Sequence, residues 1–134
     1  MADCPQKERV IQYAKDRFGT DAEYLWSDIP GAAVFRHSAS KKWYGLIMGV
    51  PSAKLGLPGD DSVDVLDVKC NTIMIGSLLS EKGFLPAYHM NKNHWLSILL
   101  NDSVPDDQIF SLLELSYDSV APKRRRRNSQ PAEE

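Results

Sequence analysis

The sequence has little cysteine and no long apolar run, and both absences narrow the class of protein. Cys4 and Cys70 are the only cysteines among 134 residues. Two are too few for a disulfide framework, and their separation fits no zinc pattern. No stretch approaches the roughly 18 apolar residues that cross a bilayer. The N-terminal residues are polar and lack the apolar centre of a signal peptide, so we expect a cytoplasmic protein without a membrane partner.

Recognised catalytic and ligand-binding motifs are also missing. The sequence contains neither G-x-x-x-x-G-K-[ST] nor G-x-G-x-x-G. The aspartates between residues 60 and 67 lack the spacing and the terminal glutamate of an EF-hand, so Asp64 and Asp67 are interpreted as strand positions that face water. His89 and His94 do not have a zinc-ligand spacing. We therefore expect no cofactor, no metal site and no catalysis.

Charge is distributed unevenly along an ordinary globular composition, with 43% hydrophobic and 25% charged residues. Residues 1–122 carry 11 basic and 16 acidic residues, a net charge of −5. Residues 123–134 have a net charge of +3, because Lys123 is followed by Arg124, Arg125, Arg126 and Arg127. The pattern predicts one domain over residues 1–122 and a disordered basic tail over residues 123–134.

Apolar periodicity predicts an α+β fold. We expect a helix over residues 6–18 that stops at Gly19, β-like runs over 22–26, 32–37, 43–50 and 63–70, and a hairpin connection over 38–42. A second helix, capped by Asn71 or Thr72, is expected to stop at Gly83. The Leu85-Pro86 pair breaks the pattern, with a short strand near residues 87–89. A last strand over 94–100 and a helix from Pro105 to Pro122 follow. An antiparallel sheet with helices on one face would bury these stripes.

Several segments resemble one known family. Residues 85–95, LPAYHMNKNHW, look like the signature of the MmcQ/YjbR family. Residues 41–48 resemble its central hairpin strand, residues 65–71 its strand-to-helix junction, and residues 103–106 and 115–117 its closing helix. The resemblance runs from about residue 5 to residue 122.

The resemblance implies a CyaY-like (frataxin-like) α+β fold. It would have an antiparallel or mixed sheet of about five strands, helices packed on one face, and double-wing-like hairpins. Members of the family are often labelled DNA-binding proteins, and no enzymatic mechanism comes with the resemblance. Two departures are clear. The arginine-rich tail is not part of the family core, and the first helix lacks the acidic ridge that frataxins use for iron.

The segment around His89, Lys92 and His94 is the most chemically loaded in the chain. If it spans a turn between strands, these side chains could converge with Asn91 as an anion site, and Tyr88 or Trp95 would supply a stacking face. The alternative is a purely structural turn that Asn91 closes, with His and Trp packed on the sheet. We expect Lys69, at a strand end, to join this group.

Two further basic segments are candidates for phosphate contacts. Arg36, His37, Lys41 and Lys42 flank the first hairpin and form either a basic wing tip or an ordinary polar turn. The tail arginines either add affinity for nucleic acid or an anionic surface, or only aid solubility.

The sequence thus favours a non-catalytic binding module with nucleic acid as its ligand. The acidic body argues against strong non-specific DNA binding unless its few cations cluster on one face. Two alternatives stay open. One is a small-molecule or protein-binding domain that uses a concave sheet lined by Trp26, Trp43 and His89. The other is an enzyme that relies on the His/Lys cluster. The sequence leaves the oligomeric state open, with a monomer favoured.

Overall fold

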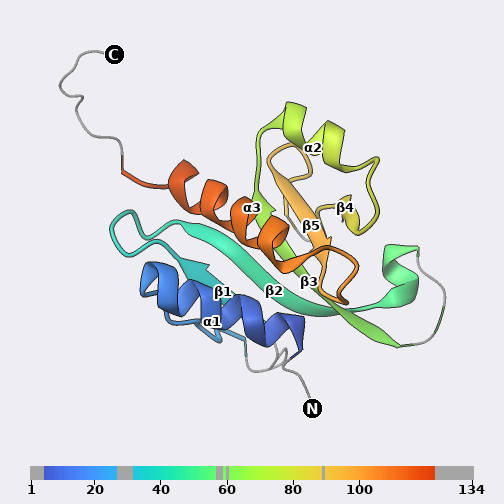
Figure 1. Ribbon diagram of the computed structural model, residues 1–134, viewed down its shortest axis with the longest axis horizontal. Coiled ribbons are helices and arrows are strands. Elements are labelled where there is room, and N and C mark those ends of the chain that lie inside the picture. The colour runs from blue at the N-terminus through green and yellow to red at the C-terminus, as the bar shows by residue number, and fades with distance from the viewer. Residues whose placement is uncertain (1–4, 27–31, 57–58, 60, 89, 123–134) are drawn as a thin grey trace.

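The computed structural model describes residues 5–26, 32–56, 59, 61–88 and 90–122. These ranges contain the helices α1 (Gln6–Phe18), α2 (Thr72–Leu78) and α3 (Asp106–Ser119) (Figure 1). They also contain the strands β1 (Ala33–Arg36), β2 (Trp43–Pro51), β3 (Ser62–Lys69), β4 (Phe84–Pro86) and β5 (Trp95–Leu99). A short 3-10 helix, η1 (Ser52–Leu55), follows β2. The α+β class predicted from the sequence is confirmed.

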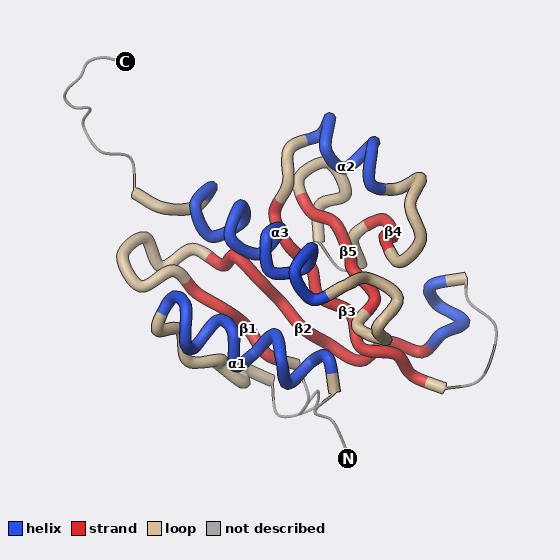
Figure 2. Tube along the Cα trace, viewed as in Figure 1, coloured by secondary structure: helices blue, strands red, loops and turns tan. Residues whose placement is uncertain are grey.

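The strands form one antiparallel sheet in the order β1-β2-β3-β5-β4 (Figure 2). Because neighbouring strands run in opposite directions, β1, β3 and β4 end where β2 and β5 begin. The β1–β2 turn, the β3–α2 junction and the β4–β5 connection therefore meet at one end of the sheet. The β2–β3 and β5–α3 connections lie at the opposite end.

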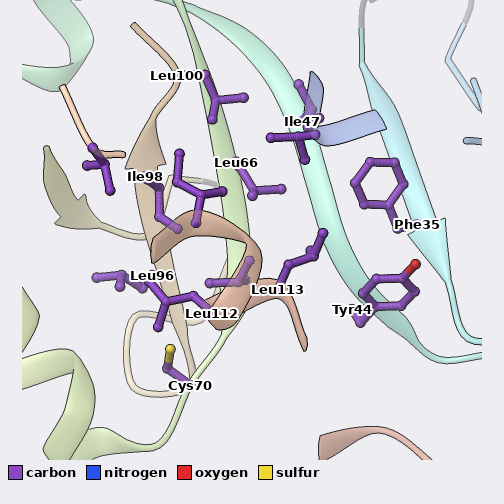
Figure 3. Close-up of a cluster of buried hydrophobic side chains, with 14 of the residues drawn as sticks. Phe35, Tyr44, Ile47, Leu66, Cys70, Leu96, Ile98, Leu100, Leu112 and Leu113 are labelled. Carbon is purple, nitrogen blue, oxygen red and sulfur yellow. The ribbon is translucent and has the colours of Figure 1, made fainter. Parts of the chain in front are cut away.

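The helices of the described residues pack on one face of the sheet and enclose the main core (Figure 3). The stripes predicted for the first and last helices are confirmed, since Val10 and Ala14 of α1 and Ile109, Leu112 and Leu113 of α3 are buried. The two helices lie side by side and run in the same direction. Their contacts include stacked rings, Tyr13 on Phe110 with centroids 4.0 Å apart and Phe18 on Tyr117 with centroids 4.1 Å apart.

One buried hydroxyl fixes the C-terminal half of α3 to the sheet. Ser116 Oγ accepts the Lys69 N–H at 2.9 Å and donates to the Tyr44 carbonyl at 2.6 Å. Tyr44 is the second residue of β2 and Lys69 is the last residue of β3, so the bonds satisfy backbone groups of two neighbouring strands. The end of α3 is thereby held over the sheet end at which the β1–β2 turn lies.

The second face of the sheet carries a smaller apolar cluster. Its fully buried members are Ala32, Met48, Val50, Val65 and Leu99. None of the three α-helices in the described ranges contributes to it, and Trp26, Tyr88 and Leu55 of η1 are among the partly buried residues packed against it. Trp26 also meets Trp43 edge to face, with ring centroids 5.9 Å apart. The two tryptophans expected to line a concave sheet therefore contact each other.

Three local predictions are wrong. Residues 22–26 contribute only a single bridge, Glu23 with Val34, rather than a strand. The short strand expected near residues 87–89 lies earlier, at Phe84–Pro86, where the terminal Pro86 needs no ladder N–H. Gly83 does not cap α2, which ends at Leu78. Instead Gly83 has a φ of +94° and precedes β4.

Candidate functional site

The β1–β2 turn presents two lysines and buries its histidine. Lys41 and Lys42 are exposed, whereas His37 is 6% exposed and stacks on Tyr117 with ring centroids 4.4 Å apart. His37 Nδ1 accepts the Ala39 N–H at 3.0 Å and the Ser40 N–H at 3.3 Å. The histidine therefore stabilises the turn from inside, and the two lysines, unlike the histidine, are accessible to a ligand.

Arg36, predicted as a phosphate contact, is already engaged by protein groups. Its Nε lies 3.0 Å from Glu23 Oε2, and its Nη1 donates to the Lys41 carbonyl at 3.3 Å. The ion pair compensates the charge of Arg36, and these bonds together with the one from Nη2 to Glu23 engage three of its five N–H groups. We therefore remove Arg36 from the candidate phosphate ligands.

The β4–β5 connection is closed by Asn91, as the structural alternative expected. The Asn91 carbonyl accepts the N–H groups of His94 at 3.1 Å and Trp95 at 2.9 Å, and its Oδ1 accepts the Asn93 N–H at 2.8 Å. Lys92 and His94 are exposed on this turn. His89 lies outside the described residues, so its predicted role stays a prediction.

Trp95 does not offer a stacking face. It is 9% exposed, and Tyr88 is partly buried against the second apolar cluster. The alternation of β5 places Trp95, Ser97 and Leu99 on one face of the sheet, and that face is covered. The expectation of an aromatic platform is therefore wrong for Trp95, because its ring contributes to packing.

A cleft of about 350 Å³ lies between α2 and α3, beside the end of β3 and the start of β5. Lys69 and His94 both line it, so the structure brings together two groups that the sequence analysis paired. Cys70 also lines it, but burial raises the pKa of its thiol. A thiol held in its neutral form is a poor nucleophile, so the cleft is better suited to binding than to covalent chemistry.

Asp67 is a buried polar group, so the prediction that it faces water is wrong. Its side chain is 0% exposed, its Oδ1 accepts a hydrogen bond from the Ser97 hydroxyl, and Ser97 in turn accepts the Tyr88 N–H at 2.9 Å. Among the described residues, Oδ2 has no hydrogen-bond partner. Burial raises the pKa of Asp67 to about 7, although the Ser97 hydrogen bond and the charge of Lys92 act in the opposite direction.

The alternation of residues along β3 indicates that Asp67 is buried. Residues 63, 65 and 67 share one face of a strand, and Val63 and Val65 both belong to the second apolar cluster. Strand parity therefore places Asp67 on a covered face, although periodicity alone does not indicate which face is covered.

The described ranges contain neither a metal-ion cluster nor a membrane-spanning helix. No three His, Cys, Asp or Glu side chains gather there in a way that could hold a metal ion. Within the same ranges, no helix is long and apolar enough to span a bilayer.

The fold and its polar groups define a small α+β domain with a five-stranded antiparallel sheet and helices on one face. A family model described as YjbR matches residues 17–119. The YyaQ protein of Bacillus subtilis is 40% identical over 111 residues, which cover 83% of this chain and 94% of that protein. The chain therefore belongs to the YjbR family, and the predicted resemblance is confirmed.

Solved structures agree with this placement. A crystal structure of a Pseudomonas syringae protein superimposes with a TM-score of 0.84 at 42% identity, covering 86% of this chain and 98% of that one. A Deinococcus radiodurans protein with a DUF419 domain superimposes with a TM-score of 0.66 at 20% identity, covering 91% of this chain and 84% of that one. The second likeness concerns the fold alone.

Proposed function

We propose that the protein is a non-catalytic nucleic-acid-binding module whose phosphate contacts come from one end of the sheet. The proposed contact surface, here named the basic end, consists of Lys41, Lys42, Lys69, Lys92 and His94. Lys41 and Lys42 are on the β1–β2 turn, Lys69 ends β3, and Lys92 and His94 precede β5. Antiparallel pairing carries the proposal, because it brings these separate segments to a single end of the sheet.

Residues 1–122 have a negative net charge, which argues against nucleic-acid binding, but their acidic and basic side chains are separated in the fold. The carboxylates Asp61, Asp64, Asp102, Asp106 and Asp107 belong to the β2–β3 region and the start of α3, at the opposite end. Acidic groups near the basic end are largely engaged. Glu23 pairs with Arg36, and Glu114 lies 3.5 Å from Arg17. Asp118 and Asp16 are exposed and form no ion pair within the described ranges, so they are exceptions. A negative total charge is therefore compatible with a local positive surface.

The basic tail follows the same end of the fold. Ser119, the last residue of α3, lines the cleft together with Lys69 and His94. Arg124 to Arg127 begin five residues further along the chain. We propose that these arginines add phosphate contacts to those of the folded residues.

A salt titration of the full chain tests the proposal. Binding of fluorescent oligodeoxynucleotide should weaken log-linearly with salt, and replacing both Lys41 and Lys42 by Gln should lower the slope by about one for each phosphate that is no longer neutralised. The matched control replaces Lys54 and Lys82, exposed lysines near the opposite end, by Gln. It makes the same change in net charge and should leave the slope nearly unchanged.

A tail variant separates the two sources of charge. Replacing Arg124, Arg125, Arg126 and Arg127 by Gln in the full chain should weaken binding but leave a measurable salt-dependent affinity. Complete loss with the tail variant, together with no effect of the Lys41/Lys42 change, would contradict the role of the folded basic end.

A second candidate, a small-molecule-binding domain, is favoured by the cleft itself. Its volume of about 350 Å³ is at the lower limit for small-molecule sites. Binding of an uncharged ligand there should depend little on salt, whereas phosphate contacts should depend on it strongly. The two candidates are thus separated by one titration.

We also propose that the fold is CyaY-like and that the protein acts in the cytoplasm. The parallel α1 and α3 on one face of an antiparallel sheet support the first inference. The second is supported by Cys70, a buried free thiol of the kind that reducing compartments preserve.

A further inference from the structure

The cleft between α2 and α3 has apolar sides and a polar rim. Met74 of α2 and Leu115 of α3 line its sides, and Lys69, His94, Asn71 and Ser119 lie at its border. We propose that this cleft receives one unstacked base of a single-stranded nucleic acid, with the neighbouring phosphate at Lys69 and His94. The inference rests on the proposed function and names the form of nucleic acid that the site prefers.

The apolar sides fit the flat face of a base. Leu115 is 50% exposed although it lies on a helix that packs on the core. The first turn of α2 extends the apolar surface, since Ile73 is 85% exposed and lines a shallow groove with Met74. Bases removed from a stack are held between apolar or aromatic side chains in proteins that bind them. A base placed here would cover apolar surface that is otherwise in contact with water.

The rim supplies the polar half of the recognition. Lys69 carries a positive charge, and no carboxylate is among the described lining residues. Asn71 caps α2 by accepting the Met74 N–H on its Oδ1 at 2.8 Å, which fixes the direction of its amide group. Its Nδ2 is a donor that the cap does not use. A charge and fixed donors around an apolar cleft are complementary to a base with its phosphate.

A cleft that receives a single base disfavours the binding of double-stranded nucleic acid. In a duplex each base is paired and stacked, so insertion into a side cleft costs a few kcal/mol of unstacking. Trp95 is buried and offers no exposed ring on which successive bases could stack. Single strands reach the cleft without that cost.

The decisive experiment compares a short oligothymidylate with an abasic deoxyribose-phosphate backbone of the same length, using anisotropy and the full chain. Both probes carry the same phosphates, so they differ only in the bases. We expect the oligothymidylate to bind about tenfold more tightly, the magnitude typical of one bound base. Duplex of the same sequence should bind no more tightly than the abasic probe.

Two exposed leucines provide a variant and its control. Leu115→Gln removes an apolar wall of the cleft and should bring the affinities for the two probes close to each other. Leu79→Gln makes the same change at a residue that is 39% exposed at the end of α2 and does not line the cleft. It should preserve the tenfold difference.

The outcomes distinguish the two proposals. Equal, salt-dependent affinity for both probes would overturn the base cleft and leave the phosphate-binding function intact. A preference for bases that Leu115→Gln does not reduce would also overturn it. Absence of binding to either probe would overturn both.

Discussion

Raising the pH from about 5 to about 8 is expected to lower the free energy of unfolding through Asp67 by roughly 2 to 3 kcal/mol. The pKa of this carboxyl is raised from 3.8 to about 7, chiefly because burial disfavours its charged form. The folded state therefore holds a proton that the unfolded state releases. The resulting stabilisation is complete below the unfolded pKa and is lost as pH rises through the folded pKa.

Asp67→Asn isolates this contribution. The variant should be more stable than the original protein, and the difference should be roughly 2 to 3 kcal/mol larger at about pH 8 than at about pH 5. Urea unfolding followed by tryptophan fluorescence measures both values. Comparing two proteins at each pH removes the contribution of the three histidines, which are common to both.

Asp64→Asn is the matched control, because Asp64 lies on the same strand and is only partly buried. Its effect on stability should be small and similar at the two pH values. If Asp67→Asn also had a small and pH-independent effect on the free energy of unfolding, burial would not disfavour the charged form of Asp67. That result would contradict the account.

Gly83→Ala is expected to destabilise the fold by about 3 kcal/mol, from backbone strain together with overpacking. Gly83 has a φ of +94°, and a Cβ added there would lie 2.3 Å from Val104 Cγ2. Val104 is 1% exposed and cannot move easily. The Gly83 carbonyl also accepts the Leu99 N–H at 2.9 Å, so a shift of this backbone would disturb the pairing of β5.

Gly76→Ala makes the same chemical change with the opposite expectation. Gly76 lies within α2, and no heavy atom lies within 4 Å of an added Cβ. The substitution should stabilise the protein by about 0.5 to 1 kcal/mol, because alanine is the better helix former. Thermal or urea unfolding of both variants checks the pair. A tolerated Gly83→Ala would mean that Val104 packs less tightly against the β4 entry than its position indicates.

Local patterns predicted most of the elements for identifiable physical reasons. The stripes of α1 and α3 repeat at helical spacing because one side of each helix packs on the sheet. Asn71, one of two candidate caps, is the one whose side chain accepts a first-turn N–H. Residues 22–26 have strand-like composition, but only Glu23 finds a backbone partner. Composition does not determine whether a neighbouring strand is available.

The sequence predicted several residues of the candidate site, but it did not predict which of them would be buried or ion-paired. Lys69, at a strand end, was expected to join the group of His89, Lys92 and His94, and the structure places Lys69 and His94 on one cleft. The ion pair of Arg36 with Glu23 and the burial of Trp95 depend on tertiary packing, which the order of residues does not reveal. The domain boundary at residue 122 and the role of the tail stay predictions, since residues 123–134 lie outside the described ranges.

The central claim is that single-stranded nucleic acid contacts the basic end of the folded domain, and amide chemical-shift mapping tests it most directly. Oligothymidylate added to the isotope-labelled full chain should perturb the amides of Lys41, Lys42, Lys69, Lys92 and His94 and those of the cleft. Amides at the opposite end, around Asp64 and Asp102, should remain in place. Perturbations confined to residues 123–127, or centred on that opposite end, would contradict the account.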